Sequence, residues 1–255
     1  MPKDKKKNNF INPKTGRISI TDAFGENLAK ILLEKIVVVH KNFNAKAFQK
    51  DVRIGVIDKS YTQRIEIIAD CLHKYLPEEY PKALKILMQV LGPENEEETG
   101  MFTNFYWIMP IGKFVEKYGL NHFPESIKAI EEITKRNTGE YAIRSFAVKY
   151  PDKVLKVCMK WAQSKNFHLR RLASEGLRPK LPWAPKLDVW IDNPKPVFDI
   201  LEMLKEDEVK FVKKSVANHM RDWVKVNPKE VEKIISKWSK SKNEHTKWIV
   251  KHALR

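Results

Sequence analysis

The sequence contains few of the residues on which several classes of protein depend. It has only two cysteines among 255 residues, Cys71 and Cys158, which excludes a disulfide framework and a zinc site made of four thiolates. No apolar run approaches the roughly 18 residues that a membrane-spanning helix needs. The N-terminus is rich in lysine and lacks the apolar segment of a signal peptide. We therefore expect an intracellular, cytoplasmic protein with no membrane partner.

Glycine is also scarce, at nine residues, and the alternating patterns with tight glycine turns that are typical of β-sheets are nearly absent. Apolar residues instead recur at three- and four-residue spacing, as in Leu28, Ile31, Leu32 and Ile36. This spacing predicts an all-α protein. Residues 1–20, rich in asparagine and lysine, are expected to form a flexible basic arm.

An internal repeat predicts how the helices are arranged. Residues 151–178 align with residues 228–255 at an offset of 77, without gaps and with 11 identities in 28 positions. Each copy predicts two helices, with a proline opening the first and a Ser-Lys-Asn turn before the second. A weaker copy begins near Pro194. Helix pairs at this spacing are typical of HEAT-like repeats, which stack into a curved solenoid.

The second helix of each pair is expected to line the concave face of the solenoid. We expect this face to form a basic groove, because these helices carry the cations Arg170, Arg171, Lys213, Lys214, Lys247 and Lys251. His168 and His245 recur at the same repeat position, which favours a structural role at the helix start over metal binding. We predict one HEAT-like domain over 21–255, with chemically uninformative N-terminal helices over 21–100 and the groove and site over 101–255.

The positive charge is clustered. The net charge is +16, and residues 135–186 alone contribute 13 basic and 3 acidic side chains, while residues 210–255 contribute 13 and 4. Phosphate contacts that release counterions need clustered cations, so this distribution favours a nucleic-acid partner. A lysine-rich solvated surface without a partner is the alternative. A protein-binding scaffold would predict a more balanced groove.

The few acids in the basic segments are candidate functional groups. Asp152 lies in the first turn of a predicted helix, where its carboxylate favours the helix dipole. Glu140, Glu175 and Asp222 have no such explanation. Spacing alone also permits an ordinary structural role, in the pairs Glu140–Arg144, Glu175–Arg171 and Asp222–Lys225.

A proline-bounded stretch after Glu175 is unusual in composition. It reads GLRPKLPW, and Pro179 and Pro182 predict a stiff extended loop that presents Trp183. An aromatic ring beside a carboxylate in a basic groove suits contact with a nucleobase or a sugar. A plug between two repeats is equally compatible with the sequence.

Three motifs resemble the signatures of one family. They are TGEYAIRSF over 138–146, RRLASEGLRPKLPW over 170–183 and KSVANHMRD over 214–222. They resemble the AlkC/AlkD superfamily of HEAT-like DNA glycosylases, and they are closer to the AlkC branch. The second motif is the most specific, and the resemblance runs through most of the chain after the arm. Because the chain ends at Arg255, we expect the form without a C-terminal immunoglobulin-like domain.

The resemblance implies excision of N-alkylated bases from DNA, in particular the cationic lesions 3-methylcytosine and 1-methyladenine, with 3-methyladenine as a further candidate. It also implies a monofunctional hydrolase without a metal or an organic cofactor, whose products are a free base and an abasic site. We expect a monomer without an obligate protein partner, associated with the nucleoid of a prokaryote.

By motif position, the resemblance places Glu140, Glu175 and Asp222 in the groove as the catalytic acidic cluster. We expect Glu175 to be the main group, with Asp222 assisting, Glu140 supporting and Trp183 as the aromatic neighbour. The side chains expected to bind DNA are Arg144, Arg170, Arg171, Arg178, Lys213, Lys214, Asn218 and Lys247. The alternative is a non-catalytic HEAT-like module that binds nucleic acid through the same groove.

Overall fold

The computed structural model describes residues 19–100 and 105–255, and all regular structure in these ranges is helical. The all-α prediction is therefore confirmed. None of the helices in this part of the chain is long and apolar enough to cross a membrane. The elements are α1 (Ile20–Ala23), α2 (Glu26–Val39), α3 (Ala45–Gly55), α4 (Tyr61–Tyr75), α5 (Tyr80–Gln89), η1 (Tyr106–Ile108), α6 (Met109–Tyr118), α7 (Phe123–Thr134), α8 (Glu140–Lys149), α9 (Pro151–Ala162), α10 (Phe167–Glu175), α11 (Lys195–Leu204), α12 (Lys210–Val226), α13 (Pro228–Ser239) and α14 (Glu244–Ala253).

The predicted N-terminal arm falls almost entirely outside the described residues. Of the range 1–20, only Ser19 and Ile20 are described, and they belong to the start of α1. The Ser19 side chain caps this short helix by accepting a hydrogen bond from the backbone N–H of Asp22.

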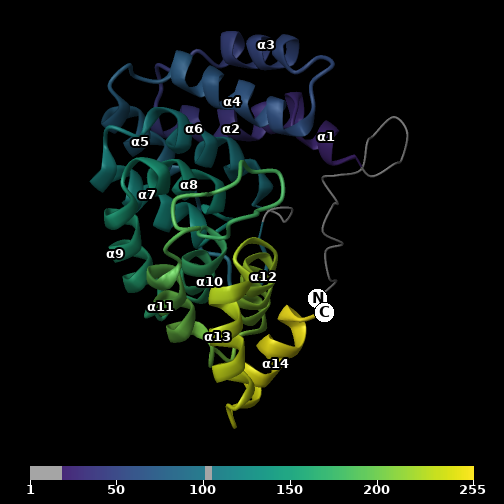
Figure 1. Cartoon of the computed structure of the whole chain (residues 1–255). Coiled ribbons are helices and arrows are strands. Elements are labelled where there is room, and N and C mark those ends of the chain that lie inside the picture. The colour runs from purple at the N-terminus through teal and green to yellow at the C-terminus, as the bar shows by residue number, and fades with distance from the viewer. Residues whose placement is uncertain (1–18, 101–104) are drawn as a thin grey trace, which may run out of the picture.

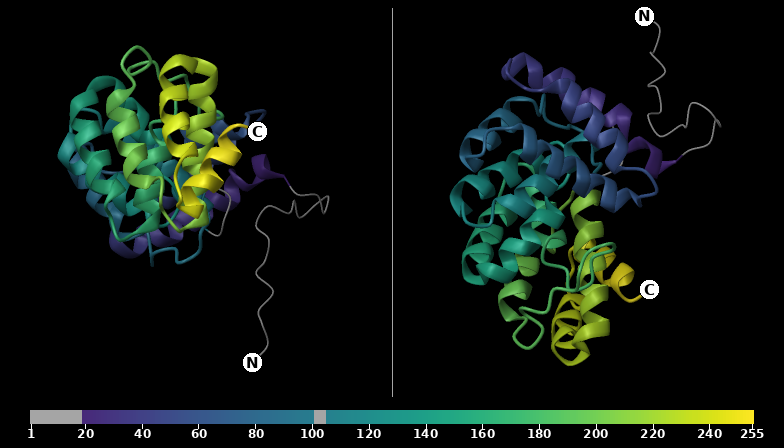
Figure 2. Two further views of the ribbon diagram at one scale, coloured as in Figure 1. Left: turned by 60° about the horizontal axis from the view of Figure 1, so that its bottom comes forward. Right: turned by 90° about the horizontal axis from the view of Figure 1, so that it is seen from above.

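The helices stack in pairs from one end of the molecule to the other (Figure 1). Helices α2, α3 and α4 form the N-terminal end, and α13 and α14 form the C-terminal end. Figure 2 shows the same progression from two further sides. One continuous apolar core runs through the stack, in keeping with a repeat array whose units bury their apolar faces against their neighbours.

The internal repeat is confirmed in the structure. Helices α9 and α10 form one copy, α13 and α14 the other, and Asn166 and Asn243 cap the second helix of each. The equivalent tryptophans make equivalent contacts. Trp161 Nε1–H donates to Glu131 at 2.6 Å, and Trp238 Nε1–H donates to Glu202, also at 2.6 Å. In the weaker copy Pro194 is the N-cap of α11 and does not occupy its first turn.

The recurring histidines have the predicted structural role at the start of a helix. His168 is buried at the start of α10, and its Nε2 lies 2.9 Å from the carbonyl oxygen of Asn95. His245 donates its backbone N–H to the capping Asn243 and receives Lys213 at its ring nitrogen Nδ1. Within 19–100 and 105–255, no group of histidine, cysteine and acidic side chains could hold a metal ion.

Candidate functional site

The three carboxylates singled out in the sequence are joined by two arginines into one buried chain of charges. Arg171 lies 2.6 Å from Glu140 and 3.6 Å from Glu175. Arg178 lies 2.6 Å from Glu175 through Nη1 and 2.8 Å from Asp222 through Nε. The five side chains are between 4% and 14% exposed. The order along the chain is carboxylate, guanidinium, carboxylate, guanidinium, carboxylate.

Two glycines allow close packing at the helix ends that carry Glu140 and Glu175. Gly139 precedes Glu140 at the start of α8, and a Cβ there would lie 2.6 Å from Thr134 Oγ1 and 2.7 Å from an Ile130 methyl. Gly176 follows Glu175, and its Cβ would lie 2.6 Å from a methyl of Ile143 in α8. A larger residue at 139 would displace the start of α8, which carries Glu140, from α7. A larger residue at 176 would displace the end of α10, which carries Glu175, from α8.

Glu175 lies where a carboxylate is locally unfavourable. It is the last residue of α10, and the C-terminal end of a helix carries partial negative charge. Arg178, three residues later, and Arg171, one turn earlier, offset this repulsion. A carboxylate that is unfavourable for its own helix, and that buried cations stabilise instead, is typical of a functional site.

The two carboxylates on Arg178 differ in pKa. Burial would raise the pKa of Glu175, but the guanidiniums of Arg171 and Arg178 and the Ser215 hydroxyl outweigh it, so the pKa lies below the usual value. Burial is the dominant effect on Asp222, and its pKa lies above the usual value despite Arg178. Glu175 is therefore a firmly ionised group and Asp222 the stronger base.

Glu175 accepts hydrogen bonds at both of its oxygens, whereas Asp222 accepts at one. Glu175 accepts from Arg178 at Oε1 and from the Ser215 hydroxyl at Oε2, at 2.6 Å each. Asp222 accepts from Arg178 at Oδ2. Among the described residues, no protein donor bonds to its Oδ1. Asp222 thus has an oxygen available to a bound water or substrate.

The loop that follows α10 is held by a buried arginine. Arg144 Nη1 donates to the carbonyl oxygens of Gly176, at 3.4 Å, and Arg178, at 2.6 Å, while Nη2 donates to that of Pro185. Within this loop Trp183 has a φ of 59°, in the left-handed region that a bulky residue rarely adopts. The residue is 64% exposed. The structure therefore excludes the alternative that Trp183 is a buried plug.

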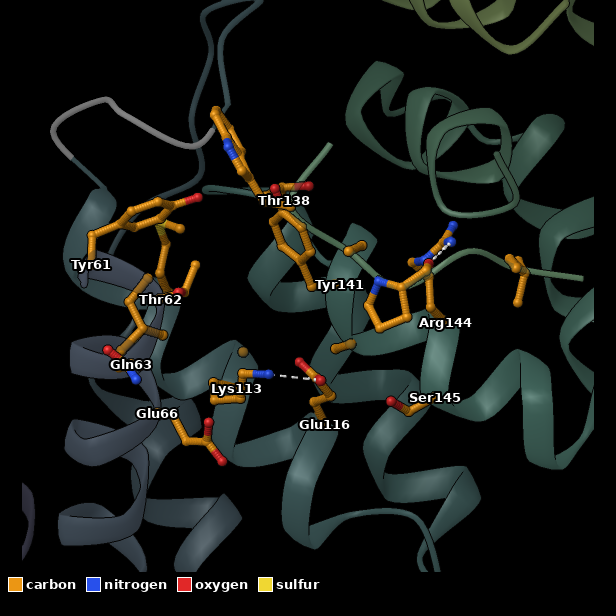
Figure 3. Close-up of a pocket in the computed structure, with 18 of the residues that line it drawn as sticks. Tyr61, Thr62, Gln63, Glu66, Lys113, Glu116, Thr138, Tyr141, Arg144 and Ser145 are labelled. Atoms are coloured by element: carbon orange, nitrogen blue, oxygen red, sulfur yellow. Dashed lines mark hydrogen bonds and ion pairs between the residues drawn. The ribbon is translucent and has the colours of Figure 1, made fainter. Parts of the chain in front are cut away.

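A pocket of about 260 Å³ opens beside Trp183. Its lining comes from α4, α6, α8 and the segment 183–187. Figure 3 shows Tyr61 and Tyr141 facing each other across it, with Lys113 and Glu116 between their helices. The rings of Tyr61 and Trp183 meet edge to face, with centroids 5.8 Å apart. Thr138 connects the pocket to the charged chain, because its hydroxyl donates to Glu140 at 2.8 Å.

Four arginines that we expected to bind DNA contact protein groups in this structure. Arg171 and Arg178 are occupied by the carboxylates, and Arg144 by the loop carbonyls. Arg170 lies 2.6 Å from Asp207 and donates to the carbonyl oxygens of Ser164 and Lys165. Their guanidiniums are bonded to protein acceptors, and a phosphate contact of these arginines stays a prediction. The alternative pairs that spacing permits, Glu140–Arg144 and Asp222–Lys225, are not among the ion pairs of the described residues. Glu140 pairs with Arg171, and Asp222 pairs with Arg178.

The remaining predicted contacts divide by their position on the helices. Lys214, Asn218 and Asp222 follow one another at four-residue spacing and so lie on the same face of α12. Lys214 is exposed and Asn218 is half-buried. Lys213 instead packs against α14, with Nζ 3.0 Å from His245 Nδ1 and 5.7 Å from the Trp248 ring centre. Lys247 forms an exposed pair with Glu244 at 2.7 Å.

Several residues of this region were missed by the sequence analysis. Tyr61 lies in the range 21–100, which we treated as uninformative, yet it forms one wall of the pocket. Ser215 and Tyr141 lie inside the quoted motifs, next to Lys214 and Glu140, and their neighbours in the sequence were the available signal. Glu116 has no such signal, because only the fold brings α6 against α4 and α8.

The fold and the site together define a helical-repeat protein with a buried chain of carboxylates and arginines across α8, α10 and α12. The chain belongs to the DNA alkylation repair enzyme family, whose sequence pattern matches residues 111–255. It is 35% identical over 237 residues to the uncharacterized protein YhaZ of Bacillus subtilis (strain 168). That alignment covers 92% of this chain and 64% of the relative.

Two solved structures are similar to the chain. The alkylpurine DNA glycosylase AlkC of Pseudomonas fluorescens, bound to DNA containing an abasic site analog, matches with a TM-score of 0.83 and 33% identity over 92% of this chain and 64% of that one. AlkD2 from Streptococcus mutans matches in fold, with a TM-score of 0.60 and 22% identity over 82% of this chain and 97% of that one. The chain is thus a member of the AlkC/AlkD superfamily with the HEAT-like fold, closer to AlkC, and it spans about 64% of the length of AlkC and of YhaZ.

Proposed function

We propose that the protein is a monofunctional DNA glycosylase that hydrolyses the N-glycosidic bond of cationic alkylated bases. The observation that carries the proposal is the buried chain in which Glu140, Glu175 and Asp222 share two arginines. A phosphate-binding surface gains nothing from buried carboxylates. The similarity to AlkC, whose structure contains DNA with an abasic site analog, supports the same function.

Hydrolysis of such a glycosidic bond depends on negative charge near the sugar and does not require a general acid to protonate the base. A base such as 3-methylcytosine or 1-methyladenine in DNA is already positively charged, so it leaves without being protonated. The sugar that remains has oxocarbenium character, and nearby carboxylates stabilise its positive charge, as in glycoside hydrolysis. Glu175, held ionised by Arg171 and Arg178, suits this electrostatic role.

We propose for Glu175 and Asp222 roles that are the reverse of those we expected from the sequence. The proton acceptor for the attacking water must have an accessible oxygen and some basicity. Glu175 has neither, because both of its oxygens accept short hydrogen bonds and its pKa is lowered. Asp222 has both, and we assign it as the general base. We assign Glu140 and Arg171, at the opposite end of the chain of charges from Asp222, the role of holding Glu175 in position.

The rate of base release should depend on pH through Asp222. The pKa of Asp222 is raised by burial, and the base must be ionised to accept a proton. The rate is therefore low when pH is below this raised pKa, increases through it, and is level above it. Single-turnover rates measured from pH 4 to pH 8 test this expectation. A rate that is constant down to the ordinary range of an aspartate would contradict it.

Lys214 is an exposed cation that we expect to contact phosphate, because it shares the α12 face with Asn218 and Asp222. Lys214→Ala should weaken binding to damaged and undamaged duplexes alike, and should reduce the slope of log K against log salt by about 1. Fluorescence anisotropy over a salt series measures both effects. Lys156→Ala, an exposed lysine on α9, is the matched control and should leave the slope unchanged. Equal slopes for wild type and Lys214→Ala would exclude this contact.

A non-catalytic DNA-binding module is the second candidate, since buried ion pairs can also have a purely structural role. The two functions are separated by incubating the protein with duplexes that carry a single 3-methylcytosine, 1-methyladenine or 3-methyladenine, beside an undamaged duplex. A glycosylase produces abasic sites in at least one of the damaged duplexes and none in the undamaged duplex. Strand cleavage in alkali detects these sites. Salt-sensitive binding without any abasic product would support the module.

A further inference from the structure

A buried serine bonds one oxygen of Glu175. The Ser215 hydroxyl, from α12, donates to Glu175 Oε2 at 2.6 Å. A second acceptor, the hydroxyl oxygen of Ser174, lies 3.0 Å from the same Ser215 oxygen. Both serines are buried, so these contacts are made within the protein. A hydroxyl carries one proton, and Ser215 can therefore fully satisfy only one of the two acceptors.

His219 lies on the far side of Ser174 and completes a line of polar groups. Its ring nitrogen Nδ1 lies 3.4 Å from Ser174 Oγ, and the residue is fully buried. The carbonyl oxygens of Ser174 and Leu177, near the end of α10, also lie close to the ring, but neither bonds Nε2. Among the described residues Nε2 has no hydrogen-bond partner. A proton on Nε2 would be a buried donor without an acceptor, which favours the tautomer with the proton on Nδ1.

The position of the histidine proton decides the direction of the whole line. The pKa of His219 lies well below its usual value, because burial and two nearby arginines disfavour the charged ring, so the ring carries one proton. With that proton on Nδ1, the ring donates to Ser174, Ser174 donates to Ser215, and Ser215 donates to Glu175. With the proton on Nε2, Ser174 would donate to Nδ1 and would compete with Glu175 for the Ser215 proton.

We propose that Ser215 is a positioning residue that fixes the orientation of the Glu175 carboxylate. His219 acts through Ser174 to keep the Ser215 hydroxyl directed at that carboxylate. The inference rests on the proposed function, in which Glu175 stabilises positive charge on the sugar. Arg178 bonds Oε1 of Glu175, so the bond from Ser215 to Oε2 fixes the rotation of the carboxylate about its last torsion. A group that stabilises developing charge is most effective when its orientation is fixed in advance.

The direction of the line can be measured in the whole protein without DNA. At pH 7, nitrogen-15 NMR should show the His219 ring as neutral with its proton on Nδ1. The carbon-13 resonance of the Glu175 carboxyl should shift in Ser215→Ala, which removes the donor to Oε2. A proton on Nε2, or a Glu175 resonance that is unchanged in Ser215→Ala, would overturn the proposal.

Single-turnover rates test whether this orientation affects the reaction. With a damaged duplex from which wild type releases base, and with enzyme at saturation, Ser215→Ala should release base about tenfold more slowly. Its affinity for the duplex should stay within about twofold of wild type, because the serine is buried. Ser126→Ala is the matched control, since Ser126 is also buried and donates to the Gly119 carbonyl oxygen at 2.9 Å. Equal rates for the two variants would exclude the positioning role.

A double substitution separates the proposed line from ordinary packing. His219→Leu leaves Ser174 free to accept from Ser215, so base release should slow about fivefold and the Glu175 resonance should shift. Adding Ser174→Ala removes the competing acceptor and should restore both. Losses that add in the double variant would overturn the role of His219. Release of no base from any damaged duplex would overturn the proposed function, whereas the tautomer and the Glu175 resonance would still report the line of hydrogen bonds.

Discussion

Asp222→Asn should lower the single-turnover rate of base release from a 3-methylcytosine duplex by about 10²–10³, the usual contribution of a general base. Asparagine keeps the size of the side chain and can still accept from Arg178, but it cannot take a proton from water. The acid limb of the pH profile should disappear with the carboxylate. Rates measured with the enzyme in excess over DNA report the chemical step directly.

Asp199→Asn is the matched control for this substitution. Asp199 lies on the surface of α11 and pairs with Lys195, so its amide variant should release base at the wild-type rate. Affinity for undamaged DNA should be similar in all three proteins. An Asp222→Asn rate within threefold of wild type would return the role of the base to Glu175 or to another group.

Arg178→Met should lower the free energy of unfolding by about 3–5 kcal/mol, the range for breaking a buried ion pair by removing one partner. Arg178 is the shared partner of Glu175 and Asp222, and its removal leaves both carboxylates buried with one guanidinium fewer. The pKa of each should then rise. Urea unfolding at pH 7 measures the loss of stability, and base release should fall with it.

Lys195→Met removes a cation from an ion pair that is exposed on both sides, with side chains 77% and 50% accessible. It should cost less than about 1 kcal/mol, as is usual for surface pairs. If Arg178→Met costs no more than Lys195→Met, the carboxylates are stabilised by something other than Arg178, and the chain of charges is not the unit that we describe.

The repeat architecture was predictable because it depends on local chemistry that recurs along the chain. The prolines that open α9 and α13 and the asparagines that cap α10 and α14 act within their own helix turns. The three carboxylates were predictable for a different reason, since an acid in a strongly basic segment is conspicuous in the sequence alone.

The pairing of these carboxylates was not predictable from spacing. Arg171 lies four residues before Glu175, yet its shorter contact, at 2.6 Å, is to Glu140, which comes from a different helix. Arg144 lies four residues after Glu140, yet it binds the carbonyl oxygens of a loop. The partner of each arginine depends on how closely the end of α10 approaches α8. Gly176 allows this approach, because a Cβ there would meet Ile143.

The charge distribution separates two tasks. The overall net charge of +16 favours a polyanion such as the DNA that we propose as partner, whereas the buried chain in α8, α10 and α12 holds three carboxylates on two guanidiniums. Long-range attraction acts from the exposed lysines and is reduced by salt. The carboxylates are largely buried, so their effect on a developing positive charge is local and strong. Salt should therefore weaken DNA binding more than it slows the chemical step.

The most direct test of the central claim is a single-turnover measurement of free base released from a 3-methylcytosine duplex by wild type and by Asp222→Asn, at enzyme concentrations that saturate the DNA. We expect wild type to release free 3-methylcytosine and leave an abasic site, and we expect the variant to bind the same duplex with little release. Release at equal rates would contradict the assignment of Asp222. Saturated binding by wild type without release, from this duplex or from the 1-methyladenine and 3-methyladenine duplexes, would contradict the glycosylase itself.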